Sequence, residues 1–164
     1  MSPRAAWRLE SLGFGPVYDY AAGKVDWMAA GRPTEGTGAA QPRAGQRARH
    51  DVPRSRLEER VGEASARARA AGWRMSIVVN DHDIVLGVLE GKALDGDPDA
   101  LVADAMRPGP STHRAHEPAA GLADTLRKRD LHRAIITTPE GELIGVAFLE
   151  DLNGVTGMRH APPS

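Results

Sequence analysis

The sequence lacks cysteine, a large net charge and any long apolar run, and each absence excludes a class of protein. There is no cysteine among the 164 residues, which excludes disulfide bonds, thiolate metal sites and cysteine nucleophiles. The longest apolar run, residues 84–89, is far too short to span a bilayer, and the N-terminal residues have no apolar core typical of a signal peptide. We therefore expect a cytoplasmic protein without a membrane span.

The charge balance argues against polyanionic partners. The formal net charge is −1, whereas proteins that bind nucleic acids or anionic membranes usually carry a positive excess. A modest cluster of arginines lies between residues 43 and 56, but no aromatic residues alternate with them. A solvated surface explains such a cluster better than a nucleic-acid site. We expect neither nucleic acid nor membrane among the partners.

An internal repeat organises the middle of the chain. Its clearer copy lies at residues 132–152, where a β-branched apolar run, residues 134–138, is followed by a Pro-Glu-Gly turn and a second apolar run. This order predicts a β-hairpin. A weaker copy lies at residues 75–89, and Gly87 of that copy aligns with Gly145, 58 positions later. A constant offset across strand, turn and strand indicates a duplicated structural unit.

An amphipathic helix is expected before each hairpin. In the first copy, Ser55 and Glu58 form a capping-box pattern, which predicts a helix that starts at Ser55 and ends at Gly72. In the second copy, apolar residues at positions 122, 123 and 126 form the stripe of another helix. One helix and two strands cannot cover their own apolar face, so two units should pack together. The predicted fold class is α/β (α+β), with a helix and a small β-sheet in each unit.

The first 36 residues form a separate appendage with the predicted order helix, strand, helix. The runs Arg4–Leu9, Gly13–Phe14 and Ala30–Pro33 resemble the C-terminal end of a rhodanese-like sulfurtransferase domain. The resemblance implies no activity, because the catalytic cysteine of that family would lie before Met1 and the chain has no thiol. Residues 1–36 are therefore predicted to be a non-catalytic fragment, either an evolutionary remnant or the end of a domain that starts upstream.

The repeat itself also points to a family. The relevant residues are 76–81 and 87–89 in the first copy, and 134–136, 140–146 and 151–152 in the second. In this order they resemble a tandem pair of cystathionine-β-synthase-type (CBS) domains, known as a Bateman module. Residues 102–108 are similar to the usual lead-in to a second CBS motif. The resemblance implies two motifs packed as a pseudo-twofold pair.

These interpretations divide the rest of the chain into four parts. Residues 37–48 are rich in Gly, Ala, Pro, Gln and Arg, which predicts a flexible linker. The first CBS motif is expected at residues 49–98 and the second at residues 99–152. Residues 153–164 are predicted to form a disordered tail.

The CBS resemblance also implies a ligand. The family commonly binds adenine nucleotides or adenosyl compounds in clefts between paired motifs, so AMP, ATP and S-adenosylmethionine are the expected ligands. Its signature after the second strand is Gly-hydrophobic-x-Thr/Ser-x-x-Asp, in which the carboxylate binds the ribose hydroxyls. The residues predicted to bind the ligand are Asp151, Arg133, His132, Thr112 and Val146.

Both motifs depart from this signature. The second motif has Asp151, but Phe148 stands where the hydroxyl residue is expected, and the first motif has Glu90 and Ala93 at the two positions. A carboxylate at Glu90 would repel phosphate unless a cation lay between them. An ordinary acid at a helix start would equally explain Asp151, and a strand-edge charge facing water would explain Arg133.

Two functions fit these observations. The first is a homodimeric regulatory CBS pair that binds an adenine nucleotide or adenosyl ligand and passes a conformational change to a partner, as Asp151, His132 and Arg133 suggest. The second is a dimerisation or interaction scaffold that has lost nucleotide binding, as Phe148 and Glu90 suggest. Neither an acid–base pair nor a nucleophile motif is placed for catalysis, and no set of metal ligands converges. We expect a protein that is neither an enzyme nor a metalloprotein.

Overall fold

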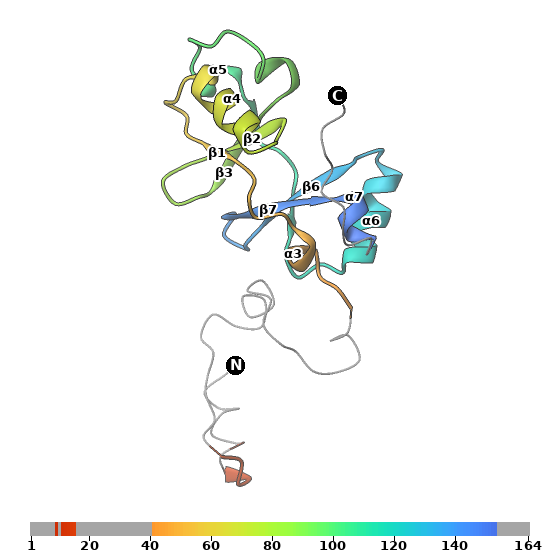
Figure 1. The fold of residues 1–164 in the computed structure, drawn as a ribbon. Coiled ribbons are helices and arrows are strands. Elements are labelled where there is room, and N and C mark those ends of the chain that lie inside the picture. Colours follow the sequence, from red (N-terminus) through yellow and green to blue (C-terminus); the bar gives the residue numbers. More distant parts are fainter. Residues whose placement is uncertain (1–8, 10, 16–40, 154–164) are drawn as a thin grey trace.

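Two small β-sheets, each with its own helices, make up the body of the molecule (Figure 1). The structure is a computed structural model that describes residues 9, 11–15 and 41–153. The first unit runs from yellow to green in Figure 1, and the second consists of the cyan-to-blue segments together with the orange helix near residue 45. Most of the predicted rhodanese-like fragment and of the predicted tail lies outside the described residues. Among those described, no helix is both long and apolar enough to cross a membrane.

The first sheet has the strand order β1-β2-β3-β4. Its strand β1 is parallel to β2, and the other neighbours are antiparallel. The bounds are Arg54–Ser55 for β1, Met75–Val79 for β2, Val85–Glu90 for β3 and Arg107–Pro108 for β4. Its helices are α4 (Val61–Ala70), the 3₁₀ turn η1 (Gly91–Ala93) and α5 (Val102–Ala105). Buried apolar residues of α4 pack against Val78 and Leu89 of the sheet, which removes this apolar face from water.

The second sheet has the strand order β5-β6-β7, again with a parallel pair followed by an antiparallel pair. The bounds are Thr112–Arg114 for β5, Arg133–Thr137 for β6 and Leu143–Phe148 for β7. Its helices are α3 (Ala44–Arg47), α6 (Ala119–Lys128) and α7 (Leu149–Leu152). Leu122 and Leu126 of α6 are buried against Ile136 of the sheet.

The register of the strands confirms the internal repeat. Ile77 pairs with Val88 in the first sheet, and Ile135 pairs with Val146 in the second, 58 positions later in both cases. The register shifts at the same place in both hairpins, between residues 78 and 79 and between residues 136 and 137. The duplicated unit therefore has one backbone plan, with a bulge at the same position.

The repeated glycines are explained by close packing. A Cβ atom added to Gly145 would collide with the backbone oxygen of Arg49, and one added to Gly87 would collide with the side chain of Met106. Two lead-in segments, residues 44–49 before the first unit and residues 102–108 before the second, each lie against the second hairpin strand of the opposite unit at this point. Only glycine leaves room for such close contact.

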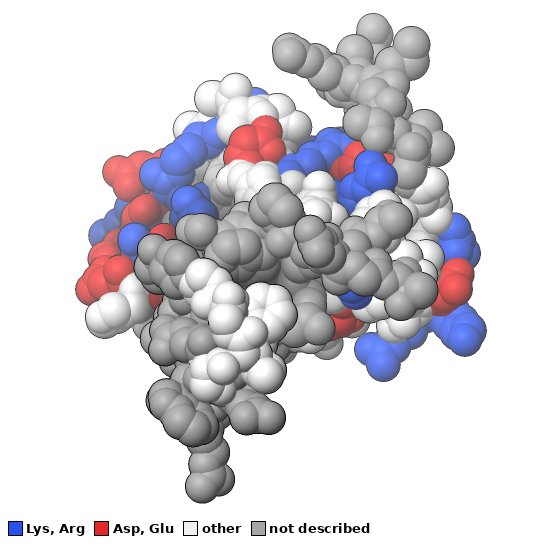
Figure 2. Space-filling view, turned by 90° about the horizontal axis from the view of Figure 1, so that it is seen from below, with Lys and Arg blue, Asp and Glu red and all other residues white. Residues whose placement is uncertain are grey.

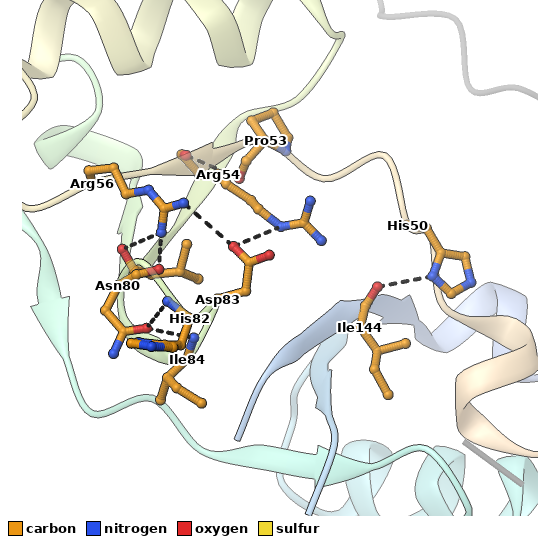
Figure 3. A network of polar contacts seen from close by, with 11 residues as sticks. His50, Pro53, Arg54, Arg56, Asn80, His82, Asp83, Ile84 and Ile144 are labelled. Atoms are coloured by element: carbon orange, nitrogen blue, oxygen red, sulfur yellow. Dashed lines mark hydrogen bonds and ion pairs between the residues drawn. The ribbon is translucent and has the colours of Figure 1, made fainter. Parts of the chain in front are cut away.

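The two hairpin turns meet between the units. The amide of Leu143 donates to the carbonyl of Asp83, and the amide of Val85 donates to the carbonyl of Gly141, at 2.9 and 3.1 Å. Figure 3 shows the first turn, in which the Asn80 side-chain oxygen accepts hydrogen bonds from the amides of His82 and Ile84, both at 3.0 Å. These contacts make the polar turn at residues 80–83 part of the contact between the units.

The same turn is held by Arg54 in β1 and by Arg56, which follows β1 directly. Arg56 donates to the backbone oxygen of Asn80, and the guanidinium groups of Arg54 and Arg56 lie 4.0 and 3.8 Å from the carboxylate of Asp83 (Figure 3). Arg114, which follows Arg56 by 58 positions, makes the equivalent contact with Thr138 in the second unit. Arg54 and Arg56 of the arginine cluster between residues 43 and 56 therefore stabilise the first turn.

Two segments depart from the predicted boundaries. Residues 41–48 were assigned to a flexible linker, but Ala44 is fully buried, and its amide donates to the carbonyl of Glu117 at 2.9 Å. Residues 102–108, assigned to the second motif, pack on the first unit, since Val102 lies in its core and β4 pairs with β3. Each lead-in segment therefore packs on the opposite unit from the one it precedes.

The start of the first helix also differs from the prediction. Helix α4 begins at Val61 after Arg60, which makes no side-chain cap. Ser55, expected as the N-cap, lies in β1, where its buried hydroxyl is 2.7 Å from that of Ser76. The capping-box pattern was misleading because Ser55 has a partner on the neighbouring strand that only the folded chain supplies.

Candidate functional site

A cleft opens between the two units on one side of the molecule. Its volume is about 310 Å³, which is at the lower end of the range of about 300–1,000 Å³ for ligand pockets. Met75, Val88, Glu90 and Arg107 line it from the first unit, and His132 and Arg133 are among the residues that line it from the second. We call it the Glu90 cleft. Residues from both units would contact anything bound there.

The charged wall of the Glu90 cleft is a carboxylate between two arginines. The Glu90 Oε1 atom accepts a hydrogen bond from Arg107 Nη2 at 2.9 Å, and Oε2 accepts one from Arg133 Nη2. The side chain of Glu90 is 25% exposed, that of Arg133 39% and that of Arg107 63%. The contact between Glu90 and Arg133 links β3 to β6, so it joins the two units. These three side chains have one more positive than negative charge, and the carboxylate of Asp130, which also lines the cleft, balances it.

Apolar side chains also line the Glu90 cleft. Met75, Val88 and Ile135 are at most 6% exposed and belong to the core cluster shared by the two units. Apolar side chains with a few convergent polar groups are the usual composition of a small-molecule site.

The pseudo-twofold relation predicts a second cleft, and in the structure this second position is filled. The residue 58 positions after Glu90 is Phe148, and the residue 58 positions before Arg107 is Arg49. The ring of Phe148 lies 5.8 Å from that of Trp73, centroid to centroid, and the guanidinium carbon of Arg49 lies 4.5 Å from the Phe148 centroid. We call this region the Phe148 cleft. Trp73 and Phe148 are the only Phe, Tyr or Trp residues between positions 41 and 153.

Asp151 is engaged by the same arginine. Arg49 Nε donates to Asp151 Oδ2 at 2.8 Å and Nη2 donates to Oδ1 at 3.2 Å, while Nη2 also donates to Glu150 Oε1 at 2.9 Å. The hydrogen bond to Asp151 is the largest cause that raises the pKa of Arg49, against a smaller lowering by burial. A bidentate pair of this kind is geometrically specific, and it occupies the carboxylate that was predicted to bind ribose.

The five predicted ligand residues do not meet at one place. His132 and Arg133 line the Glu90 cleft, whereas Asp151 lies in the ion pair with Arg49. Thr112 pairs with Ile135 within the second sheet, and Val146 is fully buried and pairs with Arg49.

Arg74, which precedes His132 by 58 positions, lies elsewhere. It lines a separate hollow of about 250 Å³ beside the end of α4, together with Arg69 and Asp95. Arg69 and Asp95 form an ion pair at 2.7 Å there. The repeat therefore does not make the Arg74 and His132 positions equivalent in their surroundings.

Arg49 and Arg107 are the residues that sequence reasoning missed. They lie 58 positions apart and stand in the two lead-in segments, so the repeat offset carried a signal that could have found them. The offset does not show that each arginine packs on the opposite unit. Arg49 contacts Phe148 of the second unit, and Arg107 contacts Glu90 of the first.

Acidic and basic side chains alternate over the described part of the face shown in Figure 2, without a broad area of one sign. Within the described residues there is also no group of three His, Asp or Glu side chains that could hold a metal ion. The candidate site is therefore the Glu90 cleft, where cations and apolar side chains converge.

Solved structures with a similar fold are CBS-domain proteins. The CBS domains of a transcriptional regulator from Streptococcus pneumoniae share 17% identity, with a TM-score of 0.61, over 68% of this chain and 97% of that one. CBSX2 from Arabidopsis thaliana, in a structure with AMP, shares 17% identity, with a TM-score of 0.60, over 69% and 94%.

A longer protein also matches. The cytosolic domain of the Mg²⁺ channel MgtE, in complex with ATP, shares 22% identity, with a TM-score of 0.59, over 68% of this chain and 51% of that one. The chain thus spans about half the length of that structure. No protein-family model and no curated protein matches the sequence. At these identities the likeness shows the fold, which is that of a CBS-domain pair, and it confirms the predicted fold class.

Proposed function

We propose that the chain is a regulatory CBS pair that binds an adenine nucleotide in the Glu90 cleft. The observation that carries this proposal is the cleft itself, because Arg107, Arg133 and apolar side chains converge there at the boundary between the two units. Arginine pairs bind phosphate oxygens with defined geometry. The apolar side chains offer a surface for the base.

The comparisons support the choice of ligand. Two of the similar structures, CBSX2 and MgtE, are complexes with AMP and ATP. In this chain Arg133, His132 and Arg107 are proposed to face the phosphates, and Met75 and Val88 the base. S-adenosylmethionine stays a third predicted ligand, although it would bring no phosphate to the arginines.

Three of the predicted ligand residues, Asp151, Thr112 and Val146, do not line the Glu90 cleft. Arg49 donates one hydrogen bond to each oxygen of the Asp151 carboxylate, so ribose would have to share this carboxylate with Arg49, and Thr112 and Val146 stay predicted contacts within the adjoining strands. We do not require them for binding in the Glu90 cleft.

Signalling would start at the contact between Glu90 and Arg133. A ligand that takes over Arg133 removes a link between the units, so their relative position becomes dependent on occupancy. We propose that a partner senses this change, and that the chain acts without catalysis, in the cytoplasm, as a homodimer.

The test is calorimetric titration of the full chain with AMP, ADP, ATP and S-adenosylmethionine, together with thermal melting. Adenosine and inorganic phosphate are matched controls for the two halves of a nucleotide. Ligand at 100 times its Kd should stabilise the fold by about 2.7 kcal/mol. Binding of at least one nucleotide, tighter than both controls, supports the proposal. No binding of any of the four at millimolar concentration overturns it.

A second function, an interaction scaffold without a ligand, is favoured by the Phe148 cleft. That cleft is filled by Trp73, Phe148 and Arg49, as expected if one ancestral site has been lost. Both candidates are expected to be dimers, so the titration separates them: a dimer by light scattering that binds none of the four ligands would support the scaffold.

A further inference from the structure

We propose that Glu90 is a built-in counter-ion that occupies an anion subsite formed by Arg107 and Arg133 until a polyphosphate displaces it. This inference rests on the proposed function only for the identity of the nucleotide. The subsite itself is argued from the three side chains and can be tested with an inorganic anion.

The geometry of the three side chains is that of an occupied anion site. Each oxygen of the Glu90 carboxylate takes a hydrogen bond from a different arginine, Arg107 on one side and Arg133 on the other. Among the described residues, Glu90 is the only side-chain partner of either guanidinium. A phosphate group has more oxygens and a higher charge than a carboxylate, so it can satisfy both arginines in the same positions.

The local charge explains why an acid stands here. Two guanidinium groups that face one cleft repel each other, and Glu90 reduces that repulsion when no ligand is bound. The same position in the second unit has Phe148, whose ring faces Arg49, while that arginine is neutralised by Asp151 and Glu150 instead. Arg107 and Arg49 thus each have their own acidic partners. Only Glu90, the partner of Arg107, lies in the open cleft, where it would compete with an anionic ligand.

Competition by Glu90 predicts a preference among ligands. A monophosphate that replaces the Glu90 carboxylate brings only a little more negative charge to the two arginines. The displaced Glu90 then lies close to the bound phosphate and repels it. A di- or triphosphate brings more charge and more oxygens, so it competes better. The cleft should therefore bind ATP more tightly than AMP, and ligand binding should break the link between Glu90 and Arg133 that joins the units.

The test compares Glu90→Gln with Glu150→Gln. Both remove the charge of a carboxylate that accepts an arginine hydrogen bond at 2.9 Å, and both keep its shape, but Glu150 lies at the Phe148 cleft. Titrations of the full chain use inorganic tripolyphosphate, ATP and AMP at constant ionic strength without divalent cations. Thermal melting checks that both variants are folded.

Glu90→Gln should bind tripolyphosphate and ATP roughly tenfold more tightly than the unchanged chain, while Glu150→Gln should stay within about twofold. The ratio of ATP to AMP affinity should become smaller in Glu90→Gln. Arg107→Gln, at a side chain that is 63% exposed, should weaken tripolyphosphate binding roughly tenfold and provides an independent check.

The outcomes separate this inference from the proposed function. If the unchanged chain binds ATP but Glu90→Gln binds it no more tightly, Glu90 is not a competing counter-ion, although the nucleotide proposal survives. Glu90→Gln could gain affinity for tripolyphosphate while neither protein binds ATP or AMP more tightly than tripolyphosphate. The counter-ion inference then stands and the nucleotide proposal fails. If no anion binds to either protein, both fail.

Discussion

The Glu90 cleft and the Phe148 cleft are built from equivalent positions of one repeated unit, yet one is open and charged and the other is filled. The backbone around them is the same, with matching strand registers and a matching bulge. Position 90 is a glutamate where position 148 is a phenylalanine, and position 131 is a leucine where position 73 is a tryptophan. These two differences put aromatic rings at the Phe148 cleft where the Glu90 cleft has a carboxylate and an aliphatic side chain.

The two clefts also differ in how much they contribute to stability. Trp73 is 8% exposed and lies in the core cluster shared by the units, so the Phe148 cleft contributes buried apolar area and therefore stability. The ion pairs of Glu90 are half-exposed, and such pairs add little stability. The Glu90 cleft therefore keeps its charged groups available for a ligand at a small cost to the fold.

The largest effect should come from removing the aromatic filling. Trp73→Ala is expected to lower the free energy of unfolding by about 3–5 kcal/mol, the usual range for losing a buried tryptophan. Leu131, its equivalent at the Glu90 cleft, is 44% exposed, and Leu131→Ala should cost about 0.5 kcal/mol or less. Urea unfolding of both variants measures the contrast. Similar losses for the two would show that the clefts do not differ as described.

A smaller effect is expected from Asp151. Asp151→Ala removes the bidentate partner of Arg49, whose side chain is 38% exposed, so stability should fall by about 1 kcal/mol. Nucleotide affinity should not change, since Asp151 does not line the Glu90 cleft. Ala93→Ser, at the equivalent position of the first unit, is the matched control in both assays. Loss of nucleotide binding in Asp151→Ala would restore the sequence-based prediction that this carboxylate binds ribose.

The smallest effect concerns pH. The pKa of Arg49 is raised by its hydrogen bond to Asp151, so its folded value exceeds the unfolded one. The contribution to stability is then complete below the unfolded pKa and is lost only as the pH rises through the folded pKa. The stability difference between Arg49→Gln and the unchanged chain should therefore show no trend from pH 7 to pH 9. A steady loss over this interval would mean that another group controls the contact.

Several elements could be predicted because their signals are local. The β-branched run at residues 134–138 and the turn at Gly141, whose φ is +96°, predicted the second hairpin. The alignment of Gly87 with Gly145 predicted a repeat that the strand registers confirm. The helix start at Ser55 was wrong because a side chain distant in sequence, Ser76, competes for the hydroxyl.

The candidate site was only half predictable. His132 and Arg133 both line the Glu90 cleft, because adjacent residues at a strand start share one edge of the sheet, and their binding of a ligand stays a prediction. Their partners Glu90 and Arg107 come from the other unit, and no local pattern shows which arginine faces which carboxylate.

The sequence by itself determined the duplicated unit, its hairpins and the likeness to a CBS pair, since periodicity, turn residues and a constant offset are properties of the chain order. Only the tertiary structure decided which cleft is open. Each lead-in segment crosses to the opposite unit, so Arg49 and Arg107 meet side chains that lie far away in the sequence. Arg49 packs on an aromatic ring, whereas Arg107 brings a charge to the open cleft. This difference depends on packing in three dimensions, which the repeat alone does not specify.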